Sequence, residues 1–323
     1  MKSPGKHNTT VILMSTYNGA RHVRQQLASI LSQLEATDEI FIRDDGSSDE
    51  TVSIIESMSD SRIRLERGKN MGFARSFFWL LYNASLTHSM YMLADQDDVW
   101  LPGKVVRAAS VLRHSDGPHL YCTRLQLVNS DLKPIGYSPN FSKAPTFWNA
   151  LCENIATGCT IAINPAALSL IRIVPYEQLA AHRITYHDWW LYLCISAFGT
   201  VTFDSKASIL YRQHGANMVG MGSGLKRYTN IIKLLLRAPW AQIMIIQMKA
   251  FQKFYGKDLS RQKHLDAENL RGLLKGSKLK IVVNFIRCPY FVRQSFGGVA
   301  LLKCLLLIEY LSGRIDIENR ASK

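Results

Sequence analysis

Short apolar runs alternate with segments of helical periodicity through the first hundred residues. The apolar runs have the length and the β-branched or aromatic content of strands that are buried on both faces. Between them, apolar residues recur at the spacing of one helix face. This alternation predicts an α/β fold with a doubly wound, mainly parallel sheet. The predicted strands cover residues 9–15, 39–43, 63–65 and 91–94, and the predicted helices cover residues 21–34, 51–58 and 73–82.

A polar cluster follows three of the predicted strands. The clusters are Ser15–Asn18, Asp44–Asp45 and Asp95–Asp98. Parallel strands end at one edge of a sheet, and α/β sheets bind ligands beyond that edge, so we expect the three clusters to form one site. No GxGxxG motif follows the first strand and no GKS or GKT loop occurs, which argues against Rossmann dehydrogenases and P-loop NTPases.

The most acidic cluster closes the apolar run that begins at Tyr91. Asp95, Asp97 and Asp98 lie within four positions, and such close carboxylates repel one another unless a cation or hydrogen-bond donors neutralise them. In an extended chain Asp95 and Asp97 point the same way, which suits Mg²⁺ or Mn²⁺ shared with a substrate phosphate. The alternative is an acidic surface turn, which the apolar segment 99–102 directly after it disfavours.

Two further candidate residues lie in the less regular middle of the chain. Asp188 falls in the first turn of a predicted helix, where capping and the helix dipole alone would explain a carboxylate. His214 follows the last predicted strand, as a candidate ligand or as a hydrogen-bonding loop residue. The predicted elements here are helices at 102–112 and from 184, strands at 120–128, 201–204 and 207–211, a loop at 130–145 and a turn entering a strand at 154–163.

The C-terminal third holds most of the positive charge. The chain has a formal net charge of +14, and the residues from Leu225 onward contain 19 Lys and Arg against 6 Asp and Glu. This change in charge along the chain predicts a boundary in the Gly-rich stretch 220–224, between a domain at 1–224 and a basic helical extension at 225–323. Helices in the extension are predicted at 228–236, 241–254 and 299–311.

Basic amphipathic helices favour an anionic membrane surface as the partner of this extension. The apolar run 299–311 contains Lys303, so we expect it to lie at a membrane interface rather than to span the bilayer. No nucleic-acid-binding module is recognisable, so no nucleic acid is expected as a partner. The alternative is a basic face that is only solvated.

The start of the chain and its cysteines bear on location. No secretory signal peptide is predicted because the first ten residues are polar, and no apolar stretch reaches the ~18 residues of a transmembrane helix. The six cysteines show no CxxC spacing, which favours reduced thiols and a cytoplasmic setting.

Seven short motifs follow one another along the chain. They are Ser15-Thr16-Tyr17-Asn18-Gly19, Asp44-Asp45-Gly46-Ser47, Asn70-Met71-Gly72, Asp95-Gln96-Asp97-Asp98, Asn154 with Thr157-Gly158-Cys159, His187-Asp188-Trp189-Trp190 and Tyr211-Arg212-Gln213-His214-Gly215. In this order they resemble the large inverting family of nucleotide-sugar glycosyltransferases with the GT-A fold, family 2. The resemblance covers roughly residues 9–220, and the last three motifs are similar to those of bacterial rhamnosyltransferases.

The resemblance implies which residues bind the nucleotide sugar. Thr16, Tyr17 and Asn18 would line the nucleotide pocket, with Tyr17 stacking on the base. Asp45 would accept the base N–H, and Asp95 would bond the ribose or share the metal shell. These roles place donor recognition at the ends of the first, second and fourth strands.

The resemblance also implies the catalytic groups. Asp97 would hold Mg²⁺ or Mn²⁺ against the diphosphate, His214 would complete the metal or diphosphate site, and Arg212 would lie near the phosphates. Asp188 would be the general base that takes the proton of the acceptor hydroxyl. Many relatives have an acidic pair where this chain has His187 and Asp188, so Asp188 is the one carboxylate at this position.

The implied function is an inverting glycosyltransferase of bacterial surface polysaccharide synthesis, peripheral on the inner face of the cell membrane. By resemblance, the donor is a deoxyhexose nucleotide such as dTDP-rhamnose and the acceptor is a lipid-linked saccharide. A nucleotidyltransferase is an alternative, although it would need a Gly-rich basic triphosphate loop near the start of the chain. A non-catalytic nucleotide-sugar-binding protein is another, which the presence of Asp97 and Asp188 disfavours.

Overall fold

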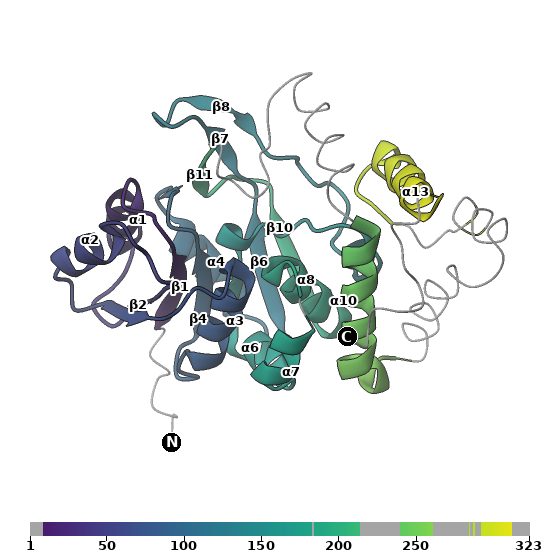
Figure 1. Ribbon diagram of the computed structural model, residues 1–323, viewed down its shortest axis with the longest axis horizontal. Helices are drawn as coiled ribbons and strands as arrows, with labels where there is room; N and C mark the ends of the chain where they lie inside the picture. Colours follow the sequence, from purple (N-terminus) through teal and green to yellow (C-terminus); the bar gives the residue numbers. More distant parts are fainter. Residues whose placement is uncertain are drawn as a thin grey trace.

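The computed structural model describes residues 9–182, 184–213, 240–260, 284, 287 and 292–311 (Figure 1). Its main sheet has seven strands in the order β10-β6-β9-β4-β1-β2-β3. The strands are β1 (Thr10–Thr16), β2 (Glu39–Asp44), β3 (Ile63–Arg67), β4 (Met90–Ala94), β6 (His119–Thr123), β9 (Ala162–Ile163) and β10 (Thr200–Asp204).

The first four strands confirm the predicted parallel core. β1 lies between β2 and β4, runs parallel to both, and pairs Thr16 with Asp44 and Met14 with Ala94. β3 extends the parallel sheet beside β2. The three predicted polar clusters therefore follow strand ends at the same edge, which we call the carboxyl edge.

β9 interrupts the parallel arrangement. This short strand lies between β4 and β6 and is antiparallel to both, pairing Ile163 with Tyr91 and with Leu120. β10 pairs with β6 in parallel on the far side. The fold class is confirmed as α/β with a mainly parallel sheet, and β9 is its exception.

A second, smaller sheet stands beside the carboxyl edge. Its order is β5-β11-β7-β8, and its strands are β5 (Val99–Trp100), β11 (Ile209–Arg212), β7 (Gln126–Val128) and β8 (Pro134–Tyr137). The single strand predicted at 120–128 is wrong. β6 ends at Thr123, the N–H of Arg124 still bonds to Asp204 in the main sheet, and β7 then joins the other sheet.

The predicted loop 130–145 is also wrong in part, because it contains β8. This strand pairs only with β7 among the described strands and lies at the edge of its sheet. An edge strand tolerates Pro134, which has no N–H to donate, and also Gly136. The composition that predicted a loop is therefore compatible with an edge strand.

Helices cover both faces of the main sheet. Alternate residues of β1 point to opposite faces. Val11 and Leu13 pack with helices α3, α5, α6 and α8, whereas Ile12 and Met14 pack with α1, α2 and α4. The helices are α1 (Val23–Leu31), α2 (Thr51–Ser57), α3 (Phe73–Asn83), α4 (Lys104–Leu112), α5 (Phe147–Cys152), α6 (Pro165–Ile171), α7 (Tyr176–Ala181) and α8 (His187–Phe198).

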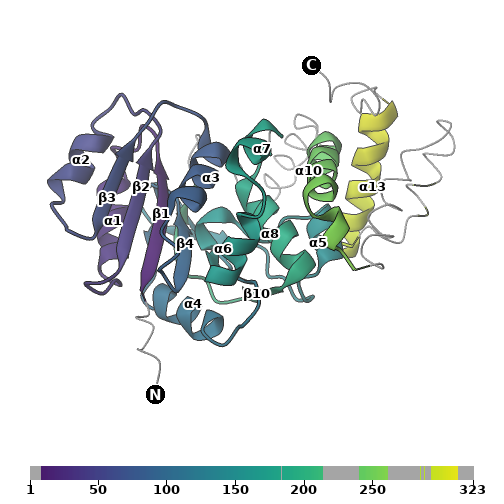
Figure 2. The same ribbon diagram turned by 90° about the horizontal axis from the view of Figure 1, so that it is seen from below.

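Two described helices belong to the basic C-terminal third, α10 (Trp240–Tyr255) and α13 (Phe296–Leu311). They confirm the helices predicted at 241–254 and 299–311, and they lie side by side beyond α8 (Figure 2). Phe251 and Tyr255 of α10 are buried in the same core cluster as Trp190 of α8. The predicted helix 228–236 and the boundary at 220–224 lie outside the described residues, and the boundary stays a prediction.

None of the helices in the described ranges combines the length and the apolar character needed to cross a bilayer.

Candidate active site

The loop after β1 is tied to the loop after β2. Thr16 is buried and its Oγ1 donates to Asp44 Oδ2 at 2.9 Å. Asp44 also accepts from the N–H and the hydroxyl of Ser47, at 2.8 and 2.6 Å. Asn18 has a left-handed φ of 48°, which asparagine tolerates, and its Oδ1 accepts from the N–H of Ser48 at 2.9 Å. Thr16 and Asn18 thus shape the predicted nucleotide pocket.

Tyr17 lies at the carboxyl edge with 48% of its surface exposed. An exposed aromatic ring in this position is available to stack on a base. Its backbone is bonded to the side chain of Gln96, which lies between the predicted ligands Asp95 and Asp97 and for which the sequence predicts no role. The Gln96 amide accepts from Tyr17 N at 2.8 Å and donates to Tyr17 O at 3.0 Å.

Asp45 is buried and fully engaged. Arg43 forms an ion pair with its carboxylate, and the backbone N–H groups of Met71 and Gly72 donate to it at 3.0 and 2.9 Å. Asp45 therefore anchors the start of α3 to the end of β2. Its acceptance of a base N–H stays a prediction, and in this structure its oxygens already accept protein donors.

The acidic cluster of β4 gathers at the carboxyl edge. One ligand atom each of Asp95, Asp98 and Cys159 lies within 4.8 Å of the others. Burial, with Asp97 and Asp188 nearby, raises the pKa of Asp95 to about 7. Burial, followed by the charges of Asp97 and Asp95, raises the pKa of Asp98 well above its usual range. The carboxylates repel one another, as the sequence predicted, and binding a cation would relieve that repulsion.

The donor set fits a hard divalent cation. Asp98 Oδ2 is buried and has no hydrogen-bond partner among the described residues. Burial raises the pKa of the Cys159 thiol well above its usual range, so this sulfur stays protonated and is a poor metal ligand. Carboxylate oxygens suit Mg²⁺ or Mn²⁺. Asp97 interacts electrostatically with Asp95 and Asp98 and stays the predicted ligand, while His214 lies outside the described residues.

Asp188 meets this cluster from the first turn of α8. Its Oδ2 accepts from the N–H of Gly158 at 3.1 Å and its Oδ1 from the N–H of Trp189 at 2.7 Å. Burial raises the pKa of Asp188 to about 6, and its charge acts on Asp95. A carboxyl group with such a pKa is ionised at neutral pH and can accept a proton. The structure therefore brings the predicted base to the predicted metal cluster.

Arg212 lies beside the acidic cluster, in strand β11 of the second sheet. It is buried, and its backbone N–H donates to Asp98 Oδ1 at 3.2 Å. Its guanidinium donates to the carbonyl of Ser130 at 2.7 Å and to the Gln25 side chain of α1. Arg212 thus joins β11 to α1 beside the carboxylates, and its predicted contact with phosphate stays a prediction.

His187 is buried beside the predicted base. Its ring stacks on Phe77 with centroids 4.1 Å apart, and among the described residues neither ring nitrogen has a hydrogen-bond partner. Burial lowers the pKa of His187 to about 3, so the ring is neutral at pH 7. A Cβ on Gly158 would lie 2.9 Å from His187 Nε2, which explains glycine in the Thr157-Gly158-Cys159 motif.

We expect His187 to make the fold sensitive to acid. Below pH ~6.5 the unfolded chain takes up a proton that folded His187 does not accept until about pH 3, so the free energy of unfolding falls as pH decreases through this range. The contribution is at most about 1.4 kcal/mol per pH unit. Urea unfolding at several pH values should show that the free energy of unfolding falls less steeply with decreasing pH for His187→Leu than for the wild type. The same pH dependence in both proteins would contradict the prediction.

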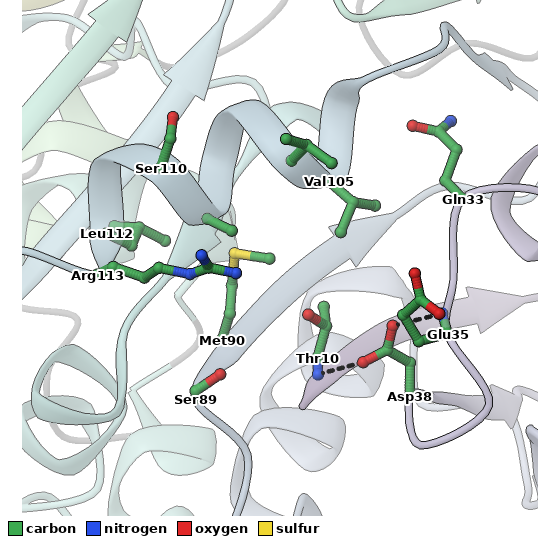
Figure 3. A pocket seen from close by; sticks show the side chains of 12 residues that line it. Thr10, Gln33, Glu35, Asp38, Ser89, Met90, Val105, Ser110, Leu112 and Arg113 are labelled. Atoms are coloured by element: carbon green, nitrogen blue, oxygen red, sulfur yellow. Dashed lines mark hydrogen bonds between the residues drawn. The ribbon is translucent and has the colours of Figure 1, made fainter. Parts of the chain in front are cut away.

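A cavity within the described part of the chain lies at the opposite edge of the sheet (Figure 3). It is lined by residues at the starts of β1 and β4, after the end of α1 and along α4, including Thr10, Met90, Gln33 and Arg113. No predicted site residue lines this cavity. The predicted site residues that the structure describes gather at the carboxyl edge instead.

A doubly wound, mainly parallel sheet with an aspartate cluster at its carboxyl edge is the arrangement of GT-A glycosyltransferases. The fold is similar to that of S. aureus TarS residues 1–349, with a TM-score of 0.52, 16% identity, and coverage of 94% of this chain and 92% of that chain. Residues 11–170 match the family described as Glycosyl transferase family 2. The chain is a glycosyltransferase with a domain of this family.

Two curated relatives have assigned activities. The dTDP-rhamnosyl transferase RfbG of Shigella flexneri is 29% identical over 228 residues, which cover 66% of this chain and 75% of RfbG. The UDP-Glc:alpha-D-GlcNAc-diphosphoundecaprenol beta-1,3-glucosyltransferase WfgD of Escherichia coli is 25% identical over 185 residues, which cover 55% of this chain and 67% of WfgD.

Proposed function

We propose that the protein is a metal-dependent, inverting glycosyltransferase that moves a sugar from a nucleotide sugar to a lipid-linked saccharide. The observation that carries this proposal is the position of Asp188. This carboxylate, with a pKa raised to about 6, lies next to the Asp95–Asp98 cluster at the carboxyl edge. One site therefore combines a base for the acceptor with carboxylates for a metal-bound diphosphate.

In the proposed reaction, two groups of residues have separate roles. Asp188 takes the proton of the acceptor hydroxyl as the oxygen attacks the anomeric carbon. Asp97, with Asp95 in reach, would hold Mg²⁺ or Mn²⁺, which when bound neutralises charge on the leaving diphosphate. Tyr17 would hold the base at the other end of the donor. Attack from the face opposite the diphosphate inverts the anomeric centre.

We favour dTDP-rhamnose as the donor because the similarity to RfbG covers 66% of this chain. The proposal is tested by screening the purified protein for thermal stabilisation by dTDP-rhamnose, UDP-glucose and other nucleotide sugars, with and without Mn²⁺. A hit is followed by transfer to a lipid-linked saccharide. Pyrophosphate release from a nucleoside triphosphate and a sugar phosphate would instead indicate a nucleotidyltransferase, and binding without donor turnover a non-catalytic protein.

The proposed location is the inner membrane surface, and α13 supports it. Leu302, Leu305 and Leu306 of this helix are buried against the core, whereas Leu301 and Ile308 are 38% and 47% exposed. The exposed residues of α13 recur at helical spacing and, among its described side chains, carry no charge. The surrounding sequence is strongly basic, as an anionic bilayer would require.

We expect the exposed face of α13 to bind anionic vesicles. Leu301→Gln with Ile308→Gln should reduce flotation with phosphatidylglycerol vesicles, because polar side chains resist burial at the lipid interface. The matched control is Val106→Gln with Ile173→Gln, which changes side chains that are 71% and 62% exposed elsewhere. Equal flotation of both double variants, or equal flotation with neutral vesicles, would contradict the membrane proposal.

A further inference from the structure

Gln96 connects the two loops that would hold opposite ends of the donor. The loop after β1 contains Tyr17, and the loop after β4 contains Asp97. Gln96 belongs to the second loop, but its side chain pairs with the backbone of the first. It accepts from Tyr17 N at 2.8 Å and donates to Tyr17 O at 3.0 Å, so both amide atoms are used. Two bonds from one planar amide fix both distance and orientation.

Gly19 makes this approach possible. A Cβ at position 19 would lie 2.3 Å from Gln96 Oε1 and 2.5 Å from Gln96 Cδ, far inside contact distance. Gly19 is not among the glycines with a positive φ, so its backbone conformation is open to other residues. The glycine is therefore required by the proximity of the Gln96 amide rather than by the turn.

The Tyr17 loop is held independently from its other side. Asn18 N donates to Ser47 Oγ at 2.9 Å, and Gly19 N donates to Thr51 Oγ1 at 2.7 Å. These bonds attach the loop to the segment after β2. Loss of the Gln96 amide would therefore leave the loop folded and remove its side-chain link to the segment that carries Asp95 and Asp97. The pairing of β1 with β4 and the bond from Gln26 Nε2 to the Asp95 carbonyl would remain.

We propose that Gln96 is a positioning residue that sets the separation between the base-binding and metal-binding halves of the donor site. This inference rests on the proposed function. A nucleoside diphosphate with its metal binds tightly only when both halves engage at once, and a fixed separation raises the effective concentration of the second contact after the first forms. Without Gln96, each half of the site keeps its own contacts with the ligand. The additional affinity gained when both halves bind the ligand at once becomes smaller.

The test compares ligands that occupy one half or both. Calorimetry measures binding of thymidine alone, Mn²⁺ alone, and dTDP with Mn²⁺, with uridine and UDP in parallel. Gln96→Met keeps the length of the side chain but removes both bonds, and Gly19→Ala displaces the amide without changing Gln96. For both variants we expect thymidine and Mn²⁺ to bind within about twofold of the wild type, and dTDP with Mn²⁺ to bind about tenfold more weakly.

Gln33→Met is the matched control. Gln33 also bonds the backbone twice, accepting from Lys104 N at 3.0 Å and donating to Ser29 O at 3.2 Å. It lies at the cavity on the opposite edge of the sheet (Figure 3). Its replacement should lower the melting temperature at most and leave all three dissociation constants unchanged.

Three outcomes would overturn the inference. Unchanged binding of dTDP with Mn²⁺ in both variants would show that the bridge is not used. Equally weakened binding of thymidine, Mn²⁺ and dTDP would show general structural damage. A loss of dTDP binding in Gln33→Met as large as in the two variants would show the same. A wild-type protein that binds neither dTDP nor UDP with Mn²⁺ would contradict the proposed function itself, whereas normal wild-type binding with unaffected variants would contradict the role of Gln96 alone.

Discussion

Asp188→Asn is expected to bind the donor normally but to turn it over about 10²–10⁴ times more slowly, the range that a positioned general base contributes. Asparagine keeps the shape of the side chain, and its one oxygen can still accept from the N–H of Trp189. Its amide nitrogen cannot accept from the N–H of Gly158, which bonds the second carboxylate oxygen in the wild type. Asparagine cannot take the proton of the acceptor hydroxyl. Single-turnover transfer, measured beside donor binding, separates these two properties.

A capping role makes a different prediction for the same variant. Loss of a first-turn carboxylate lowers stability by about 1 kcal/mol or less through the helix dipole. Glu177→Gln is the control, because Glu177 is the acidic residue in the first turn of α7. Should Asp188→Asn melt earlier, as this control does, and retain full turnover in its folded fraction, Asp188 would be a capping residue and not the base.

Asp97→Ala is expected to abolish transfer and to weaken nucleotide binding only when Mn²⁺ or Mg²⁺ is present. The reason is the crowding of carboxylates at the end of β4, where Asp97 raises the pKa values of Asp95 and Asp98. Removal of one charge should relieve this repulsion, so the variant should be folded and at least as stable as the wild type. Titrating Mn²⁺ in the presence of dTDP measures the lost metal dependence.

Asp131→Ala is a suitable control, since Asp131 is an exposed aspartate in the turn between β7 and β8. Wild-type transfer by Asp97→Ala in either metal would show that the metal assignment is wrong. The cation would then have to rely on Asp95 and Asp98, whose ligand atoms already lie within 4.8 Å of each other and of Cys159.

Local pattern was enough to predict the first half of the main sheet. Strands β1, β2 and β4 are buried on both faces, so their apolar runs are continuous and end sharply at polar residues, whereas β3 is short and partly exposed. The three polar clusters then lie at one edge of the sheet, because parallel strands all end at that edge. The pairing of Thr16 with Asp44 directly confirms that the first two clusters lie side by side.

The remaining features depend on contacts between distant segments. Nothing near residue 124 in the sequence shows that the chain passes from one sheet to another there. Likewise, the Asp45 carboxylate is engaged by Arg43 and by the N–H groups of Met71 and Gly72, from a loop that follows another strand. Gln96 resembles a spacer between aspartates until the backbone of Tyr17 is placed opposite it. Such roles require the tertiary structure.

The reversed direction of β9 decides which of its two ends lies near the candidate active site. Because β9 runs against β4 and β6, its first residue, Ala162, lies toward the carboxyl edge, and the chain arrives there through the Gly158–Thr160 turn that bonds Asp188. After Ile163 the chain emerges at the opposite edge and enters α6. A tag or foreign loop grafted after β9 would therefore lie at the edge opposite the candidate active site, whereas one grafted a few residues earlier would enter that site.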